Sequence, residues 1–257
     1  MPTIDSLASG GPLMWLLCLA SLFVGLSKGG LPGIGMISVP LLALVISPIA
    51  AAVLLLPIYI LSDVVGVWLY RRDFSSKNLK VLIPAGVLGV IAGWSTASFV
   101  SDQMVSLLIG LLGVGFCLHR WISNSAGMMA SQPSLIKGMG WGILSGFTSF
   151  VSHAGSPPYQ IYVLPQKLPK LVFAGTTTLL FAVVNLAKII PYASLHPYSA
   201  ATLKLSLVLV PIAAVGTFVG RVLVQHLTEK WFFLGVQIAL FIICLKLLSS
   251  GIMVLVL

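Results

Sequence analysis

The chain has 257 residues, of which 58% are hydrophobic and 7% are charged, and its formal net charge is +9. Soluble domains carry about 25% charged residues, so this composition excludes a soluble globular protein and predicts a polytopic membrane protein. The positive charge does not indicate nucleic-acid binding, because basic residues collect in the cytoplasmic loops of membrane proteins.

Apolar segments follow one another along the chain without the alternation of a β-barrel, so we expect an all-α polytopic membrane protein. In the first half, segments are predicted at 12–27, 33–46, 49–70, 79–100 and 104–121. In the second half, they are predicted at 135–152, 157–166, 170–190, 200–225 and 230–250. A helical span needs about 20 residues. The first two segments of each half are therefore short for full spans.

The sequence repeats itself at an offset of 125 residues. At this offset SKGGLP at 27–32 aligns with SHAGSP at 152–157, and Pro40 aligns with Pro165. With two more residues inserted, further prolines, glycines and a cysteine align: Pro84, Gly89, Gly93 and Cys117 with Pro211, Gly216, Gly220 and Cys244. The ordered matches predict two homologous halves, 1–125 and 126–257, within one integral membrane domain.

Five segments in each half would place the halves in opposite orientations, and the charges of the loops test this. The loop YRRDFSSKNLK after the third segment is basic, whereas its counterpart YASLHPYSAATLK holds only Lys204. The loop between the second and third segments shows the opposite difference in charge. In the first half it is the uncharged VISPIA, whereas in the second half it is PQKLPK, which holds Lys167 and Lys170. We therefore expect inverted repeats in a bacterial-type inner membrane, with both termini outside.

Short or Gly/Pro-interrupted segments at matching positions of inverted halves indicate a transporter site near the bilayer midplane. Each half is predicted to open with a short re-entrant or broken helical hairpin, although full spans stay open. Glycines at the tips would allow close backbone approach, and a restarting helix would point its N–H groups at an anion. The predicted substrate-binding residues are Ser27, Lys28, Gly29, Gly30, Ser152, His153, Ala154, Gly155, Ser156 and Asn185.

Asp63 is the only acidic residue clearly within a predicted helix, and Lys188 stands at the equivalent position of the second half. Asp63 would either pair with Lys28 or another cation, or carry a coupling proton. Asp63, His153 and Lys188 are therefore predicted as coupling or ion-pair residues. Structural explanations stay open, since Lys28 could extend to the membrane interface and Asp63 could serve only to orient helices.

These motifs resemble the TauE/SafE family of sulfite and organosulfonate exporters, also called the 4-toluene sulfonate uptake permease family. In the first half the resemblance rests on GLSKGGLPGIG and VPLLAL within 25–44, LLLP-x4-SD at 54–63 and YRRD at 70–73. In the second half it rests on SHAGSPP-x2-IY-x-LP at 152–165, LPK-x2-FAGT at 168–176 and F-x3-N-x2-K-x2-P at 181–191. Lys28 stands where many members have glycine, and His153 where asparagine is frequent.

The resemblance implies a secondary transporter that exports sulfite, sulfoacetate or similar organosulfonates by alternating access. A passive anion channel of the same architecture, and an uptake permease for thiosulfate or another small organic anion, remain alternatives. The sequence has no Walker-type loop and no HExxH or GxSxG motif, so an enzyme is not expected. The expected partners are the small anion, the lipid bilayer and a coupling proton or sodium ion. A homodimer is left open, and no cofactor, metal or nucleic acid is expected.

Overall fold

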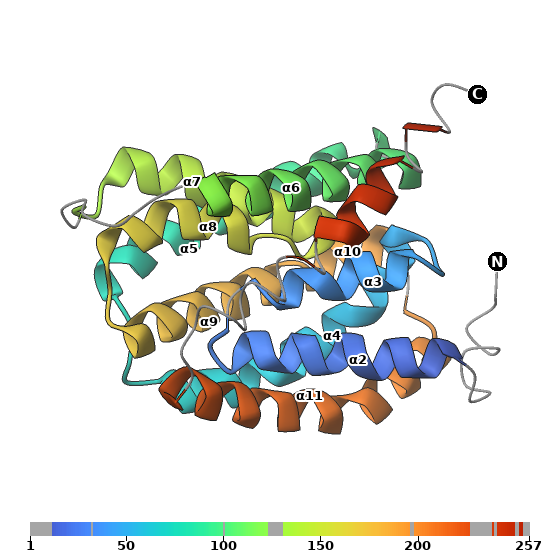
Figure 1. The fold of residues 1–257 in the computed structure, drawn as a ribbon, viewed down its shortest axis with the longest axis horizontal. Coiled ribbons are helices and arrows are strands. Elements are labelled where there is room, and N and C mark those ends of the chain that lie inside the picture. Colours follow the sequence, from blue (N-terminus) through green and yellow to red (C-terminus); the bar gives the residue numbers. More distant parts are fainter. Residues whose placement is uncertain are drawn as a thin grey trace.

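The computed structural model describes residues 12–31, 33–99, 101–122, 131–195 and 198–226, together with 238, 241–249 and 252–253. Every regular element within these ranges is a helix, as Figure 1 shows, which confirms the all-α fold class. The first elements are α2 (Pro12–Lys28), η1 (Gly35–Ile37), α3 (Ser38–Ala43), α4 (Pro48–Tyr70), α5 (Ser76–Thr96), η2 (Ala97–Phe99) and α6 (Asp102–Ile122). They are followed by α7 (Leu135–Ser152), α8 (Ser156–Val163), η3 (Leu164–Gln166), α9 (Lys170–Ala187), α10 (Ile189–Leu195) and α11 (Ala200–His226).

Four helical stretches in the described part of the chain are long and apolar enough to cross a membrane. They are Pro48–Tyr70, Ser76–Thr96, Lys170–Leu195 and Ala200–His226. Shorter apolar runs lie in α2 and α6, at Met14–Lys28 and Ser106–His119. The predicted segment 230–250 lies mostly outside the described residues. The chain is therefore a multi-pass membrane protein.

Local sequence signals explain where the long helices begin. The side chain of Ser47 accepts a hydrogen bond from the backbone N–H of Ala50, and Pro48 occupies the first turn of α4. Ser75 caps α5 in the same way by accepting from the N–H of Asn78. A serine cap satisfies a helix N–H that has no partner within the helix, and proline is tolerated where that N–H would be free.

Two helices stop inside the apolar part of the chain. α2 ends at Lys28, and Gly30 follows with a φ of +106°, a left-handed conformation that glycine adopts without strain. α7 ends at Ser152, and His153 caps it with a φ of 54°. These are the residues around which the sequence places the two hairpin tips. The chain continues as η1 and α3 after the first break, and as α8 and η3 after the second.

The predicted helix 170–190 is broken in the structure. α9 ends at Ala187, Lys188 forms a turn, and α10 starts at Ile189. The physical reason is Pro191, which has no N–H to donate to the carbonyl of Ala187 four residues earlier and whose ring crowds that carbonyl. Lys188 thus lies at a helix end and not within a continuous helix.

The helices from the two predicted halves pack reciprocally. The first helix of each half packs against the fourth of the other, α2 against α11 and α7 against α5, and the two third helices, α4 and α9, pack together. Figure 1 shows α2 and α11 lying side by side. Small residues bring the backbones together: a Cβ built on Gly25 would lie 2.0 Å from the carbonyl oxygen of Ala213. Close backbone approach of this kind is typical of membrane helices.

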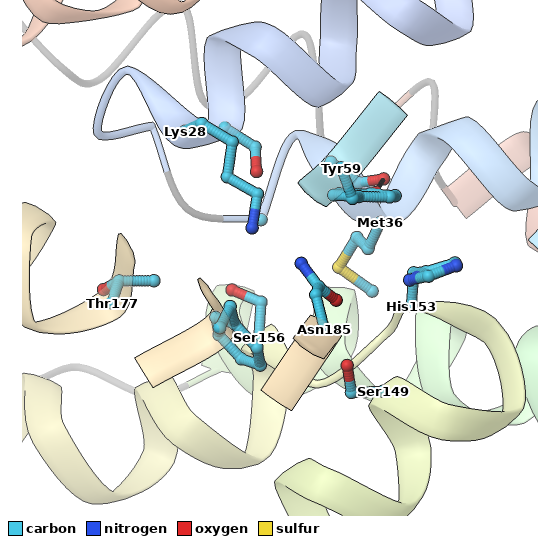
Figure 2. A pocket seen from close by; sticks show the side chains of 12 residues that line it. Lys28, Met36, Tyr59, Ser149, His153, Ser156, Thr177 and Asn185 are labelled. Atoms are coloured by element: carbon cyan, nitrogen blue, oxygen red, sulfur yellow. Dashed lines mark hydrogen bonds between the residues drawn. The ribbon is translucent and has the colours of Figure 1, made fainter. Parts of the chain in front are cut away.

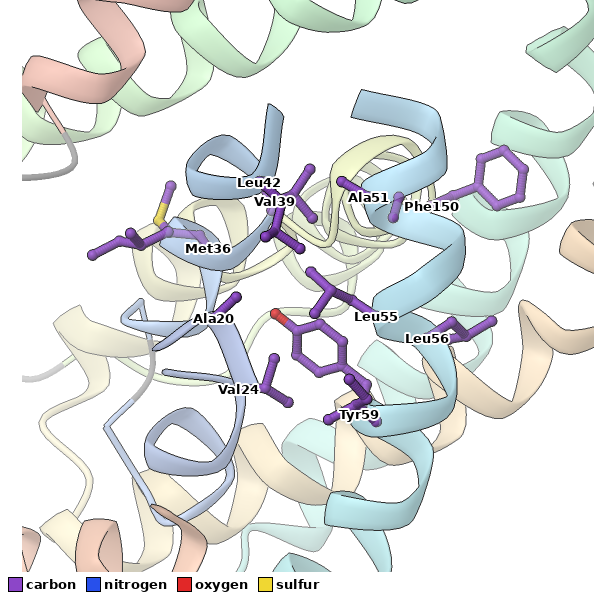
Figure 3. Close-up of a cluster of buried hydrophobic side chains, with 14 of the residues drawn as sticks. Ala20, Val24, Met36, Val39, Leu42, Ala51, Leu55, Leu56, Tyr59 and Phe150 are labelled. Carbon is purple, nitrogen blue, oxygen red and sulfur yellow. The ribbon is translucent and has the colours of Figure 1, made fainter. Parts of the chain in front are cut away.

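The first helix break is fixed against α4 by buried apolar side chains. Figure 3 shows Val24 of α2, Val39 of α3 and Leu55 of α4 in one cluster, and all three are fully buried. Because lipid chains are as apolar as leucine, such contacts stabilise the fold through close packing rather than through removal of surface from water. The break is therefore held at a defined place beside α4.

Candidate functional site

Four charged or chargeable side chains are buried together at the centre of the fold. Among all lysine, arginine, histidine and acidic side chains in the described part of the chain, only Lys28, Asp63, His153 and Lys188 are buried, with 3%, 4%, 7% and 0% of their surface exposed. They form two pairs related by the repeat offset, because Lys28 corresponds to His153 and Asp63 to Lys188. We call these four residues the buried charge cluster.

Lys28 and Asp63 form an ion pair. The Lys28 Nζ lies 2.7 Å from Asp63 Oδ1, and Asn185 Nδ2 donates to Asp63 Oδ2 at 2.7 Å. The ammonium also lies 5.1 Å from the centre of the Tyr59 ring and 5.9 Å from that of Phe181. Lys28 therefore points into the protein and does not extend to the membrane interface. Both oxygens of the carboxylate have a partner.

Lys188 and His153 form the second pair. Lys188 Nζ donates to the carbonyl and the hydroxyl of Ser149 at 3.0 and 3.1 Å, and it lies 2.8 Å from His153 Nδ1. His153 Nε2 lies 2.9 Å from the carbonyl oxygen of Ala52. Because a carbonyl only accepts, Nε2 carries the ring proton and Nδ1 accepts from the lysine. The imidazole is neutral in this arrangement, and it stacks on Tyr59 with ring centres 4.5 Å apart.

A small cavity lies between the two helix breaks (Figure 2). Its volume is about 30 Å³, which is room for about two water-sized molecules. It is lined by Ser27, Lys28, Gly33, Gly35, Met36, Tyr59, Ser149, His153, Ser156, Thr177, Phe181 and Asn185. No group of three metal-ligating side chains occurs among the described residues.

The cavity presents hydrogen-bond donors. Ser156 Oγ accepts from Gln160 Nε2 at 2.9 Å, and Ser149 Oγ accepts from Lys188. The hydroxyl protons of both serines have no acceptor among the described residues, and the Ser27 hydroxyl has no bond there either. Lys28 has one carboxylate partner in the described part of the chain and three N–H donors. A ligand that only accepts hydrogen bonds, as an oxyanion does, would match these groups.

Half of the predicted substrate-binding residues line this cavity: Ser27, Lys28, His153, Ser156 and Asn185. The others face protein. A Cβ on Gly29 would lie 2.4 Å from the carbonyl oxygen of Thr217, so Gly29 provides the close contact between α2 and α11. Gly30 is packed in the same way against the Tyr70 hydroxyl.

The remaining predicted residues of the second break, Ser152, Ala154 and Gly155, are also packed within the protein. The Ser152 hydroxyl donates to the carbonyl of Thr148 at 3.4 Å, and Ala154 belongs to the hydrophobic core. A Cβ on Gly155 would lie 2.6 Å from the carbonyl oxygen of Ser145. These three residues position the second helix break and do not line the cavity.

We predicted that a helix restarting after a break would point free backbone N–H groups at the anion. The helix that starts after the second break, α8, does not do so. Pro157 and Pro158 occupy the first turn of α8 and have no N–H. The N–H of Tyr159 is already bonded to the carbonyl of Gly155 at 3.4 Å. At the second helix break the donors are therefore side-chain hydroxyls and not a row of helix amides.

Sequence reasoning missed three side chains of the cavity that lie one helical turn before a predicted residue. Tyr59 precedes Asp63 by four residues, Ser149 precedes His153, and Phe181 precedes Asn185. Residues four apart on a helix share a face. The four-residue spacing was therefore the signal that could have found them. Met36, Thr177 and the glycines at 33 and 35 had no comparable signal.

Tyr70 connects the first helix break to the end of α4. Its hydroxyl donates to the carbonyl of Gly29 at 2.5 Å, and the Arg221 guanidinium lies 4.4 Å from the centre of its ring. Arg221 in turn lies 3.5 Å from Asp73. These contacts hold the end of α2 against the loop that follows α4.

We expect Tyr70→Phe to lower the free energy of unfolding by about 1–3 kcal/mol, because it leaves the buried Gly29 carbonyl without its donor. A lowered melting temperature in detergent would show this. Tyr198→Phe is the matched control, since the Tyr198 hydroxyl has no partner among the described residues, and its melting temperature should not fall. Equal melting temperatures for both variants would contradict the assigned role of Tyr70.

The family described as "Sulfite exporter TauE/SafE" matches residues 17–247, a range that includes both helix breaks and the whole buried charge cluster. No curated protein and no solved structure matches the chain. Because the family match covers nearly all of the sequence, the chain belongs to the TauE/SafE sulfite exporter family of membrane transport proteins.

Proposed function

We propose that this protein is a secondary transporter that moves small sulfur-containing oxyanions, with sulfite as the first candidate, outward across the membrane. The anion would occupy the cavity between the two helix breaks. The observation that carries the proposal is the Lys28 ammonium, buried at a cavity that the hydroxyls of Ser27, Ser149 and Ser156 also line. A buried ionisable residue in a membrane protein marks a functional site by default.

We further propose that the halves 1–125 and 126–257 are inverted repeats and that transport occurs by alternating access. The reciprocal packing of α2 with α11 and of α7 with α5 supports this arrangement. α3 has 6 residues and α8 has 8, far fewer than the roughly 20 residues of a span, which supports re-entrant hairpins. Rocking of one half against the other would expose the cavity to each side in turn. The basic loops support an orientation in a bacterial-type inner membrane with both termini outside.

Sulfite is the smallest of the candidate substrates, with four heavy atoms. The cavity of about 30 Å³ has room for about two water-sized molecules, so sulfite would require the least widening of it. Sulfoacetate and other organosulfonates would require more. We therefore place sulfite before the larger organosulfonates.

Proton coupling would act through the buried charge cluster. Asp63 accepts from Asn185 and is paired with Lys28, and both ring nitrogens of His153 are engaged. A proton added to either residue must break one of these contacts, which would release the Lys28 ammonium or move the second helix break. Asp63 and His153 are thus the proposed coupling residues, with Lys188 as the partner of His153.

The experiment that tests this function is flux of radiolabelled sulfite in proteoliposomes. Ser156→Ala should raise the KM for sulfite about ten-fold, because it removes a hydroxyl that would donate to a charged ligand. Ser95→Ala is the control, since Ser95 is exposed and bonded only to the carbonyl of Ala92, and it should behave as the wild type. Absence of sulfite flux, or an unchanged KM in Ser156→Ala, would contradict the proposal.

The same preparation separates a transporter from a passive channel. A transporter accumulates labelled sulfite against its gradient when unlabelled sulfite flows the other way, whereas a channel does not. We expect this counterflow, and its absence in vesicles that conduct sulfite would favour the channel.

A further inference from the structure

The helices pack into two bodies that do not coincide with the two halves of the sequence. In the first body, α2, η1, α3 and α4 of the first half pack with one another and with α11 of the second half. In the second body, α7, α8, η3 and α9 of the second half are joined by α5 of the first half. We call them the α2 body and the α7 body. In Figure 1, α2 and α11 lie along the lower edge of the molecule and α7 along the upper edge.

Within each body, the helix that comes from the other half is held by close contact of two backbones. A Cβ on Gly25 of α2 would lie 2.0 Å from the carbonyl oxygen of Ala213 of α11. A Cβ on Gly89 of α5 would lie 2.1 Å from the carbonyl oxygen of Ile143 of α7. Such close packing does not deform continuously, so the two helices of each contact are expected to move together.

Buried hydrogen bonds strengthen the same two bodies. In the α2 body, the Ser206 hydroxyl of α11 donates to the carbonyl of Leu54 of α4 at 3.0 Å. In the α7 body, Asn78 Nδ2 of α5 donates to Gln166 Oε1 of η3 at 2.9 Å. Both bonds join residues from different halves of the sequence within one body.

The buried charge cluster is divided between the bodies. The ion pair of Lys28 with Asp63 joins α2 to α4 within the α2 body. The pair of Lys188 with His153 joins the end of α9 to the end of α7 within the α7 body. Asn185 crosses between the bodies, because it lies on α9 and donates to Asp63 Oδ2 at 2.7 Å.

The cavity lies between the two bodies. Lys28 and Tyr59 line it from the α2 body, whereas Ser156 and Thr177 line it from the α7 body (Figure 2). The main contact between the bodies is that of α4 with α9, and α6 contacts both bodies at α4 and α7. A relative motion of the bodies would therefore open the cavity without disturbing the close contacts within either body.

We propose that the parts that move against each other in transport are the α2 body and the α7 body, and not the halves 1–125 and 126–257 themselves; the inference rests on the proposed alternating access. Motion occurs where α4 meets α9, while α2 stays on α11 and α5 stays on α7. Each charge pair travels with its own body. The hydrogen bond from Asn185 to Asp63 breaks when the cavity opens, so Asn185 is a positioning residue that holds the present conformation.

Four pairs of labels distinguish the two divisions of the chain. Trp15 on α2, Ile91 on α5, Ile136 on α7 and Val215 on α11 are exposed and lie outside the cavity lining. The pairs Trp15/Val215 and Ile91/Ile136 lie in one body but in different halves. The pairs Trp15/Ile91 and Ile136/Val215 lie in one half but in different bodies. Each position is changed to cysteine, as in Trp15→Cys, and two positions are labelled at a time.

The labels are gadolinium chelates attached through a thioether, because sulfite cleaves disulfides. The parent is Cys18→Ala, and it serves as the labelling blank, since Cys117 and Cys244 have none of their surface exposed. Double electron–electron resonance measures the distances with and without saturating sulfite, in the proteoliposomes in which flux is measured. We expect both pairs that join different bodies to shift by about 5 Å, the rise of one helical turn, and both pairs within a body to keep their distances.

Asn185→Ala should populate the shifted distances without sulfite, because it removes a hydrogen bond between the bodies. Asn78→Ala is the matched control, since Asn78 is also buried but donates to Gln166 within the α7 body. Its distances between bodies should equal those of the parent.

The outcomes separate this inference from the proposed function. Shifts in Trp15/Val215 and Ile91/Ile136, with constant distances in the other two pairs, would show that the halves move and would overturn the inference. Constant distances in all four pairs of a preparation that transports sulfite would also overturn it, whether or not Asn185→Ala folds. Parent-like distances in folded Asn185→Ala would overturn the role of Asn185. Absence of sulfite flux in the wild type would instead contradict the proposed function.

Discussion

Lys28→Met is expected to abolish sulfite flux and to lower the free energy of unfolding by about 3–5 kcal/mol. Removing one partner of a buried ion pair leaves the other charge without compensation, and Asp63 has only 4% of its surface exposed. The hydrogen bond from Asn185 remains, but it does not replace the lost positive charge. Flux in proteoliposomes and denaturant unfolding in detergent measure the two effects.

The double variant Lys28→Met/Asp63→Asn separates stability from transport. It removes both charges, and replacement of a buried ion pair by neutral residues of similar volume is often tolerated. We expect the free energy of unfolding to return to within about 1 kcal/mol of the wild type, the usual scale of a hydrogen bond, while flux stays absent. Recovery of flux in the double variant would show that the pair is structural and that Lys28 does not hold the anion.

The second large effect is expected where α5 crosses α7. A Cβ on Gly146 would lie 1.9 Å from the carbonyl oxygen of Gly86, so an alanine there must push the two backbones apart. Overpacking of a rigid contact typically lowers the free energy of unfolding by about 1–3 kcal/mol. For Gly146→Ala we expect a loss of about 3 kcal/mol, because the added methyl group meets backbone atoms and not a flexible side chain. α7 leads directly into the second helix break, so flux should fall as well.

Gly140→Ala on the same helix is the control for Gly146→Ala. A Cβ on Gly140 meets nothing within 4 Å, and alanine favours a helix over glycine by about 1 kcal/mol. This variant should match or exceed the wild type in melting temperature. Equal stability of the two alanine variants would contradict the close contact of α5 with α7.

The ends of most helices could be predicted because their signals are local. The predicted segments 12–27 and 135–152 differ by at most one residue from α2 and α7, where glycine or the left-handed His153 ends the helix. The break at Lys188 was missed although its cause, Pro191, stands three residues later.

The site was predicted less completely than the fold because glycine serves two purposes that the sequence does not distinguish. Gly29 was assigned to the ligand, yet the close approach that it permits is to α11, a helix almost two hundred residues away in the chain. Pairing with Lys28 or another cation was one of the two roles predicted for Asp63, because Asp63 is the only acidic residue clearly within a predicted helix, and the structure contains the Lys28–Asp63 pair. Which side chains of a helix face the cavity depends on packing with its neighbours.

The measurement that tests the central claim most directly is a structure determined with selenite, whose selenium scatters anomalously and whose shape follows that of sulfite. The account predicts a selenium peak in the cavity between the two helix breaks, with an oxygen about 2.8 Å from the Lys28 Nζ and another within reach of the Ser156 hydroxyl. The peak should be lost in Lys28→Met/Asp63→Asn. A selenium peak elsewhere in the membrane domain of a protein that transports selenite, with this cavity empty, would contradict it.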